Sequence, residues 1–146
     1  MKAVIQRVSQ ASVSVNNKTV SNINQGILIL LGVECEDTLN HAEKLAQRII
    51  NYRVFSDDAG KMNLNIEQIG GQLLVVSQFT LAADTTRGRR ASFSSAATTE
   101  HANKLYEHFI SYCQQQGVDT QSGIFGADMN IELTNNGPVT FILESH

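Results

Sequence analysis

The sequence has no tryptophan, a single proline and no long apolar run among its 146 residues. Its longest apolar stretch, residues 27–31, falls far short of the roughly 20 residues that a helix needs to cross a bilayer. The first ten residues, MKAVIQRVSQ, contain no apolar segment of the kind found in a secretion signal. These absences predict a soluble cytoplasmic protein with no membrane partner.

Metal-binding patterns are also missing. The two cysteines, Cys35 and Cys113, belong to no C-x-x-C or mixed Cys/His motif. Neither H-x-x-x-H nor H-E-x-x-H occurs, and residues 57–60 (DDAG) do not have the spacing of an EF-hand loop. We therefore expect two reduced thiols in apolar surroundings, no metal site and no cofactor.

Positive charge is in the minority, with a formal net charge of −3 and a pI of about 5.7. Such a chain has no global positive field to draw it onto nucleic acid, so any such contact must be local. One cluster stands out in TTRGRR at 85–90, where Arg87, Arg89 and Arg90 accompany a glycine. Guanidinium groups bind phosphate through paired hydrogen bonds. These arginines are a candidate phosphate site, and an ordinary solvated loop is the alternative.

The four histidines do not favour a catalytic triad. His41 and His101 stand near expected helix starts, His108 lies within an expected helix, and His146 is the last residue. None lies in a loop beside a nucleophile. We expect all four to be solvated.

Hydrophobic periodicity predicts more strands than helices. Alternation around Asn16 and Asn17 predicts a hairpin, and the apolar run at 26–32 predicts a strand covered on both faces. Two amphipathic helices are expected. The first is capped by Asp37 or Thr38, and its apolar stripe contains Leu39, Ala42, Leu45, Ala46, Ile49 and Ile50. The second ends before Gly117, its expected C′ residue, and its apolar stripe contains Ala102, Leu105, Tyr106, Phe109 and Cys113. Further strands are expected at 72–79, 118–122, 128–134 and 139–145, with a long loop at 81–98.

Most of the expected strands are joined by connections too short for parallel crossovers. The predicted fold class is therefore α+β, with largely antiparallel sheets that form a sandwich or a partly closed barrel and two main helices packed outside. A chain of this length suits one domain, residues 1–146, and no linker or internal repeat divides it.

Polar groups close the strand expected at 72–79. Ser77, Gln78, Phe79 and Thr80 follow four apolar residues, and strand alternation puts Ser77 and Phe79 on one face and the other two on the opposite face. The local pattern fits a reactive site and the polar end of an edge strand equally well.

The only proline lies in NNGPVT at 135–140, between two stretches of strand-like sequence. Proline removes a hydrogen bond from a β-ladder, so Gly137 and Pro138 should lie at a turn, bulge or edge. Base rates alone favour a trans bond, since only about 5–6% of X–Pro bonds in folded proteins are cis.

Several separated motifs together resemble the D-aminoacyl-tRNA deacylases of the bacterial and eukaryotic type. They are QRV at 6–8, ASVSV at 11–15, GKMNL at 60–64, GGQLLVVSQFTL at 70–81, GIFGADM at 123–129 and NNGPVT at 135–140. The resemblance covers the whole chain. One departure is Ala91, where the family usually has proline, which makes the loop after the arginines less rigid.

The resemblance implies a homodimer, with active sites at the subunit interface, that hydrolyses the ester between a D-amino acid and the terminal adenosine of tRNA. Ser77, Gln78 and Thr80 would be the catalytic residues and Phe79 would bind substrate beside them. A cis Gly137–Pro138 dipeptide would enter the partner's pocket and reject L-aminoacyl-tRNA. Arg7 would brace this dipeptide, Met129 would line the site, and the three arginines would bind tRNA.

Sequence chemistry adds a hypothesis about the attacking group. A threonine hydroxyl is a poor nucleophile without a base, and no histidine, lysine or carboxylate lies beside Thr80 in the sequence. The 2′-hydroxyl of the terminal adenosine adjoins the ester, so the tRNA itself is expected to supply the decisive hydroxyl. Backbone N–H groups near Phe79 and Thr80 would stabilise the oxyanion.

Chiral selection through the α-carbon has a corollary. Fixed carbonyls of Gly137 and Pro138 would exclude an L side chain but not the second hydrogen of glycine, so glycyl-tRNA should be cleaved as a side activity. Two alternatives stay open. One is a non-catalytic RNA-binding dimer that uses the Arg87–Arg90 loop together with Phe79 as a stacking platform. The other is a hydrolase that uses Thr80 or Ser77 as a covalent nucleophile.

Overall fold

The fold is organised around β1 (Lys2–Val15), a long strand with partners on both edges. The computed structural model describes all residues from 1 to 146. One edge of β1 pairs antiparallel with β3 (Gly26–Gly32) along its first half and with β2 (Lys18–Ile23) along its second half. The other edge pairs antiparallel with β8 (Asn130–Glu144). Four strands thus form the antiparallel part of the main sheet.

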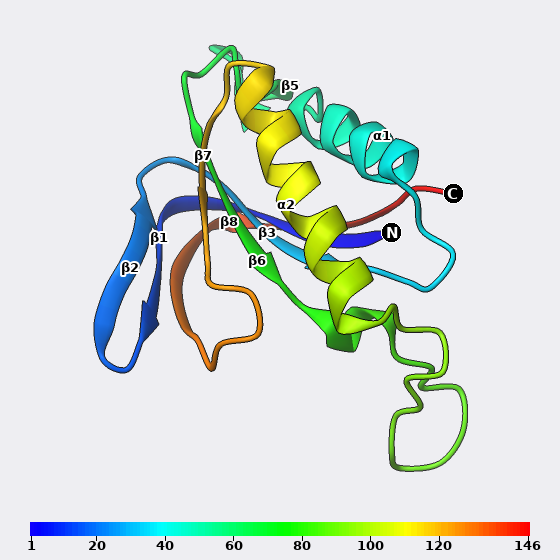
Figure 1. Cartoon of the computed structure of the whole chain (residues 1–146). Helices are drawn as coiled ribbons and strands as arrows, with labels where there is room; N and C mark the ends of the chain where they lie inside the picture. The colour runs from blue at the N-terminus through cyan, green and yellow to red at the C-terminus, as the bar shows by residue number, and fades with distance from the viewer.

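Parallel pairs extend this sheet beyond β3. β6 (Gln72–Ser77) runs parallel to β3, and β7 (Asp119–Ser122) runs parallel to β6. The crossovers pass through α1 (Leu39–Ile50) and α2 (Thr99–Gln115), and both helices lie on the same side of the sheet (Figure 1).

The strongly curved main sheet resembles a nearly closed barrel (Figure 1), and β4 (Phe55–Ser56) and β5 (Met62–Leu64) form a separate small ribbon. The predicted α+β class, with largely antiparallel pairing and two helices outside, is confirmed. The two parallel pairs are additions that the sequence did not reveal.

Both helices begin where a threonine hydroxyl caps the first turn. Thr38 Oγ1 accepts from the His41 backbone N–H, and Thr98 Oγ1 accepts from that of His101. The predicted apolar stripes are buried apart from two residues. Ala102 is half-buried, and Leu39, the first residue of α1, is 41% exposed. No helix of the chain is long and apolar enough to span a membrane.

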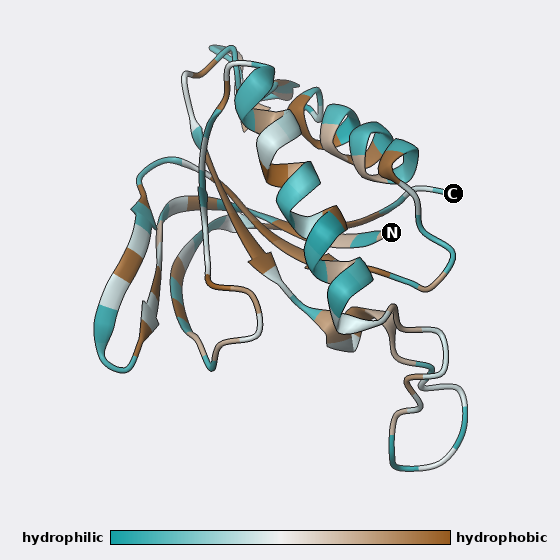
Figure 2. Cartoon of the chain, viewed as in Figure 1, coloured by the Kyte–Doolittle hydropathy of each residue, from teal (hydrophilic) through white to brown (hydrophobic).

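Two apolar clusters cover the two faces of the sheet. The larger contains 23 buried residues and lies between the sheet and the helices, where β3 and β6 form a brown band in Figure 2. The smaller lies on the opposite face and contains Val8, Ala11, Val13, Ile23, Leu28, Leu74 and Val76. Strands β3 and β6 are therefore apolar on both sides, as the run at 26–32 predicts.

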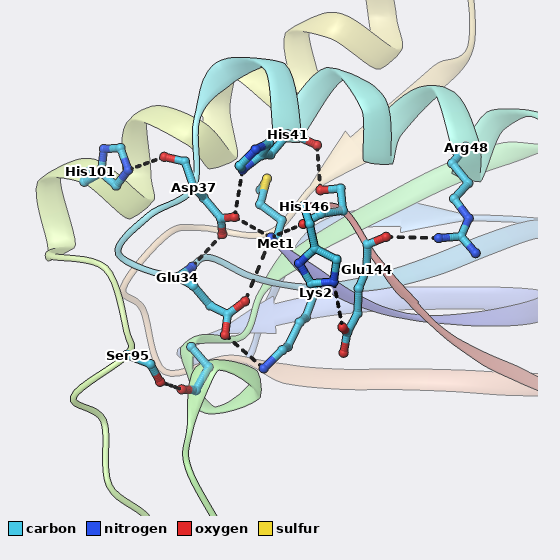
Figure 3. A network of polar contacts seen from close by, with 12 residues as sticks. Met1, Lys2, Glu34, Asp37, His41, Arg48, Ser95, His101, Glu144 and His146 are labelled. Carbon is cyan, nitrogen blue, oxygen red and sulfur yellow. Dashed lines mark hydrogen bonds and ion pairs between the residues drawn. The ribbon is translucent and has the colours of Figure 1, made fainter.

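A polar network joins the N-terminus to the start of α1 (Figure 3). The buried Met1 amino group pairs with the Asp37 carboxylate and donates to the Ser145 carbonyl at 3.0 Å. His41 Nδ1 lies 3.3 Å from the Asp37 carboxylate, and His101 Nε2 lies 2.8 Å from the Asp37 carbonyl. This end of the sheet is thereby tied to both helices.

Two expectations about reactive side chains are wrong. Three of the four histidines are half-buried and hydrogen-bonded, because tertiary contacts unseen in the sequence bring His41 and His101 to Asp37, and His108 to Glu43. Cys35 is exposed, because it follows the end of β3 where the chain leaves the core, whereas Cys113 is buried in α2.

Candidate active site

The SQFT segment lies where β6 ends and the chain turns. Ser77 is the last residue of β6, and the Gln78 N–H donates to the Leu31 carbonyl of β3 at 2.8 Å. Phe79 and Thr80 then open a short 3-10 helix, Phe79–Ala82. The first N–H groups of a helix have no partner within it, so this turn presents free donors beside the strand end.

A cavity of about 400 Å³ opens beside this turn. It lies between the ends of β3 and β6, the first turns of α2 and the segment 125–131, and apolar side chains form most of its wall. Its volume is in the range of small-molecule sites. Of the predicted site residues, Ser77, Gln78, Phe79 and Met129 line it.

Thr80 differs from its three neighbours. It is exposed beside Phe79 and does not line the cavity. Its Oγ1 accepts a hydrogen bond from the Gln78 side-chain amide at 2.6 Å. Because an amide N–H donates and cannot take up a proton, this contact orients the hydroxyl without activating it.

Two aromatic residues of the cavity wall had no site role in the sequence analysis. The rings of Tyr106 of α2 and Phe125 lie 5.6 Å apart with a 47° tilt, and the Tyr106 hydroxyl donates to the Val75 carbonyl at 2.9 Å. Burial raises the pKa of Tyr106 to about 12, so the phenol stays neutral at physiological pH. The periodicity indicated only that Tyr106 faces inward, and the GIFGADM motif contained Phe125 without a role.

Gly137 and Pro138 belong to a wide bulge in β8. Gln6 of β1 pairs with Thr140 and Val8 pairs with Asn135, so Arg7 alone stands opposite residues 136–139. The two strands expected at 128–134 and 139–145 are therefore one strand, because β1 continues the ladder on both sides of the bulge.

Side chains hold this bulge closed. Asn135 Oδ1 accepts from the Val139 N–H at 2.9 Å, and Asn135 Nδ2 donates to Thr140 Oγ1 at 3.0 Å. Arg7 Nε donates to the Asn136 carbonyl at 2.8 Å, and Arg7 Nη1 donates to the Val54 carbonyl at 2.7 Å. The arginine thus bonds the residue directly before Gly137 and anchors it to a neighbouring segment.

The Gly137–Pro138 peptide is cis, and both residues are exposed. Neither lines the cavity of its own chain. Ile131 of β8 does line it, and the six steps along the chain from Ile131 to Gly137 span about 20 Å of extended strand. The dipeptide is therefore remote from the cavity that the same chain forms.

The three arginines lie in the segment between the 3-10 helix and α2, which projects away from the sheet and helices (Figure 1). Arg87, Arg89 and Arg90 are all exposed, and none takes part in the ion pairs of the chain. Asp84 and Ser92 close the base of this loop through two backbone hydrogen bonds of 2.8 and 3.0 Å. Bonds from the Thr86 N–H and hydroxyl lower the pKa of Asp84.

The arrangement within one chain has few groups that could act as acid or base. No group of three or more His, Cys, Asp or Glu side chains is arranged so that it could hold a metal ion. The cavity wall itself consists of apolar side chains with a serine, a glutamine, a threonine and the neutral Tyr106 as its polar groups. Such a wall can bind and orient a ligand and exclude water from it.

Comparisons with known proteins agree on one family. The family model described as D-Tyr-tRNA(Tyr) deacylase matches residues 4–144. A protein of Shewanella frigidimarina (strain NCIMB 400), named D-aminoacyl-tRNA deacylase, is 65% identical over 99% of both chains. A Shewanella sp. (strain MR-4) protein of the same name is 62% identical over the same shares.

Solved structures share the fold. One described as "c-Myc DNA Unwinding Element Binding Protein" has a TM-score of 0.95 and 39% identity, covering 100% of this chain and 99% of its own. Another, described as a probable eukaryotic D-amino acid tRNA deacylase, has a TM-score of 0.84 and 17% identity over 98% of both chains. At 17% identity, this second likeness shows a shared fold and nothing further.

Proposed function

The chain belongs to the D-Tyr-tRNA(Tyr) deacylase family, whose members hydrolyse D-aminoacyl-tRNA esters. We propose the following roles for its residues in that reaction. The cavity beside the SQFT turn receives the aminoacylated terminal adenosine of tRNA. The observation that carries this proposal is the position of Ser77, Gln78 and Phe79 in the wall of one apolar, aromatic-lined cavity at a strand end.

The adenine base suits the inner part of the cavity. Tyr106 and Phe125 offer aromatic faces there, and Met129 adds a polarisable thioether. The ester then lies at the rim, next to the 3-10 helix and Thr80. Backbone N–H groups of Phe79 and Thr80 stabilise the oxyanion that forms during hydrolysis.

The hydroxyl that assists hydrolysis comes from the substrate in this proposal. Thr80 has an amide as its side-chain partner, and its own chain offers it no base. The 2′-hydroxyl of the terminal adenosine is adjacent to the ester, where effective molarities reach about 10⁵ M in favourable cases. Ser77, Gln78 and Thr80 orient the ester so that this hydroxyl activates a water molecule. The water oxygen bonds to the ester carbonyl carbon, and the bond to the adenosine oxygen breaks as that oxygen takes up a proton, which releases the D-amino acid.

Chiral selection requires a second copy of the chain. Gly137 and Pro138 are exposed and about 20 Å of strand away from their own cavity, so they reach the rim of a partner's cavity in a homodimer. Their carbonyls face the α-carbon, leave room for hydrogen and exclude an L side chain. Arg7 holds this dipeptide in place through the Asn136 carbonyl.

The projecting arginine loop binds tRNA outside the cavity. Arg87, Arg89 and Arg90 are exposed and free of ion pairs, so their guanidinium groups are available to phosphates. The protein acts in the cytoplasm, where it removes D-amino acids from mischarged tRNA before they enter translation.

One assay tests the proposal. Release of labelled D-tyrosine from D-Tyr-tRNA is measured beside release of L-tyrosine from L-Tyr-tRNA, at the same enzyme concentration. We expect cleavage of the D-ester alone. RNA binding without cleavage of either ester would instead identify a non-catalytic binding protein, and an acyl-enzyme trapped on Thr80 or Ser77 would identify a covalent mechanism.

A further inference from the structure

Two exposed aromatic residues meet at the mouth of the cavity. The rings of Phe79 and Phe93 lie 5.1 Å apart with a 42° tilt, within the range of an aromatic pair. Phe79 is 63% exposed and Phe93 is 42% exposed. Phe79 lines the cavity but Phe93 does not, so the pair extends from the mouth outward.

This pair, the aromatic platform, stands on a well-anchored base. Ser95 Oγ donates to the Ala82 carbonyl at 2.7 Å, the bond drawn at Ser95 in Figure 3. The Cys35 N–H donates to the Ser95 carbonyl at 2.9 Å, and the Ala97 N–H donates to the Val33 carbonyl at 3.2 Å. The chain directly after Phe93 is thus bonded to both the 3-10 helix and the residues that follow β3.

We infer that the aromatic platform stacks the unpaired nucleotides that immediately precede the terminal adenosine of the tRNA. This inference rests on the proposed function, because it takes the adenosine to be inside the cavity. The single-stranded 3′ end must then leave through the mouth and cross Phe79 and Phe93. Exposed aromatic side chains bind successive bases of a single strand regardless of sequence.

Charge around the platform favours a nucleic acid over a second copy of this chain. Residues 80–99 contain three arginines and one carboxylate, that of Asp84, in a molecule whose net charge is −3. Asp84 is itself occupied by Thr86 and closes the loop. Arg87, Arg89 and Arg90 precede Phe93 by three to six residues in the same loop, so a nucleotide stacked on Phe93 would have arginine side chains available to its phosphates, which combines stacking with charge neutralisation.

The test compares two substrates in steady-state kinetics: full-length D-Tyr-tRNA, and D-tyrosyl-adenosine, which lacks the preceding nucleotides. Phe93→Ala should raise KM for D-Tyr-tRNA by roughly five- to a hundredfold, with kcat retained. This range is the loss of affinity expected when one stacking contact between a base and an aromatic side chain is removed. Its effect on D-tyrosyl-adenosine should be within experimental error. Phe93→Tyr, which keeps an aromatic ring, should restore KM, and Met62→Ala serves as the control for loss of a distant exposed apolar side chain.

Three results would overturn the inference. An unchanged KM for D-Tyr-tRNA in Phe93→Ala removes the platform from binding. An equal rise of KM for D-Tyr-tRNA and for D-tyrosyl-adenosine means that Phe93 only positions Phe79. Conversion of a dimer to a monomer in Phe93→Ala, measured by light scattering, means that a second copy covers the pair. Failure of the unmodified chain to cleave D-Tyr-tRNA contradicts the proposed function instead, so the two failures are distinguishable.

Discussion

Gly137→Ala is the substitution that tests the bulge most directly. Gly137 has a φ of +144°, a backbone conformation that side chains with a Cβ rarely adopt. A Cβ at this position would lie 2.7 Å from Val139 Cγ2, 2.9 Å from the Val139 backbone nitrogen and 3.0 Å from Arg7 Nη2. The backbone contact cannot be relieved by a change of rotamer, so the bulge itself must move.

The magnitude follows from this strain. A residue forced into such a conformation costs about 1–3 kcal/mol, which corresponds to a decrease of roughly 5- to 150-fold in the population of the native bulge. Typical domains are stable by about 5–15 kcal/mol, so the variant should fold. We expect Tm to fall by about 3–10 °C. On the proposed assembly, kcat/KM for D-Tyr-tRNA falls at least about tenfold, because the displaced dipeptide no longer fits the partner's cavity.

Gly60→Ala is the matched control. Gly60 also has a positive φ, +76°, but a Cβ there would meet nothing within 4 Å. The residue lies in the turn at 57–60 and does not line the cavity of the candidate site. It should lose about 1–2 kcal/mol of stability and keep its activity. Wild-type rates on both D- and L-Tyr-tRNA in Gly137→Ala, with dimerisation intact, would refute the assigned position of Gly137.

Three further predictions use simpler assays. Thr80→Ala should keep most of its D-Tyr-tRNA hydrolysis, whereas D-Tyr-tRNA that ends in 2′-deoxyadenosine should be inert; the opposite pattern would restore Thr80 as nucleophile. Glycyl-tRNA should be cleaved measurably under conditions that cleave D-Tyr-tRNA, and its complete resistance would contradict selection by steric exclusion. Ellman's reagent should label Cys35 but not Cys113 in the folded protein, because burial raises the pKa of Cys113 to about 12 and shields its thiol; two rapidly labelled thiols in native protein would contradict this placement.

Local sequence signals predicted the helices and the first hairpin well. Each depends on contacts between residues close in the chain: the hydroxyl cap at Thr38, the apolar stripes, and the positive φ values of Asn16 and Asn17 at the hairpin turn. The predicted burial of Leu39 was wrong, because burial also depends on whether other parts of the fold cover the position where the helix begins. Periodicity contains no information about that position.

The pairing of strands that are distant in the chain was harder to predict from the sequence. The parallel ladder of β6 with β3 and β7 joins strands separated by whole helices, and no short-range signal specifies such partners. The split of β8 into two strands was wrong for a related reason. Glycine and proline signal a local break, but Arg7 and its neighbours in β1 continue the ladder past it.

The residues of the candidate site likewise fall into those that a sequence motif reveals and those that only the fold brings together. Ser77, Gln78 and Phe79 are neighbours in sequence, so a motif could reveal them, and the structure places all three in the cavity wall. Tyr106 and Phe125 reach that wall from a helix and a loop, and in the sequence their pattern was indistinguishable from that of core residues. Phe93 needed the fold as well, because only the folded chain brings it to Phe79.

Strand β8 connects the two halves of the proposed dimeric site. Ile131 near its start, with Met129 just before the strand, lines the cavity of its own chain, while the bulge of β8 carries the dipeptide that we assign to the partner's cavity. The same antiparallel ladder with β1 positions both parts, and Arg7 fixes the bulge from the β1 side. A change at Arg7 should therefore disturb catalysis in the partner's cavity and leave its own cavity wall intact. Heterodimers of one Arg7→Ala chain and one chain inactivated in its own cavity would separate these effects, since only one of the two pairings retains a complete site.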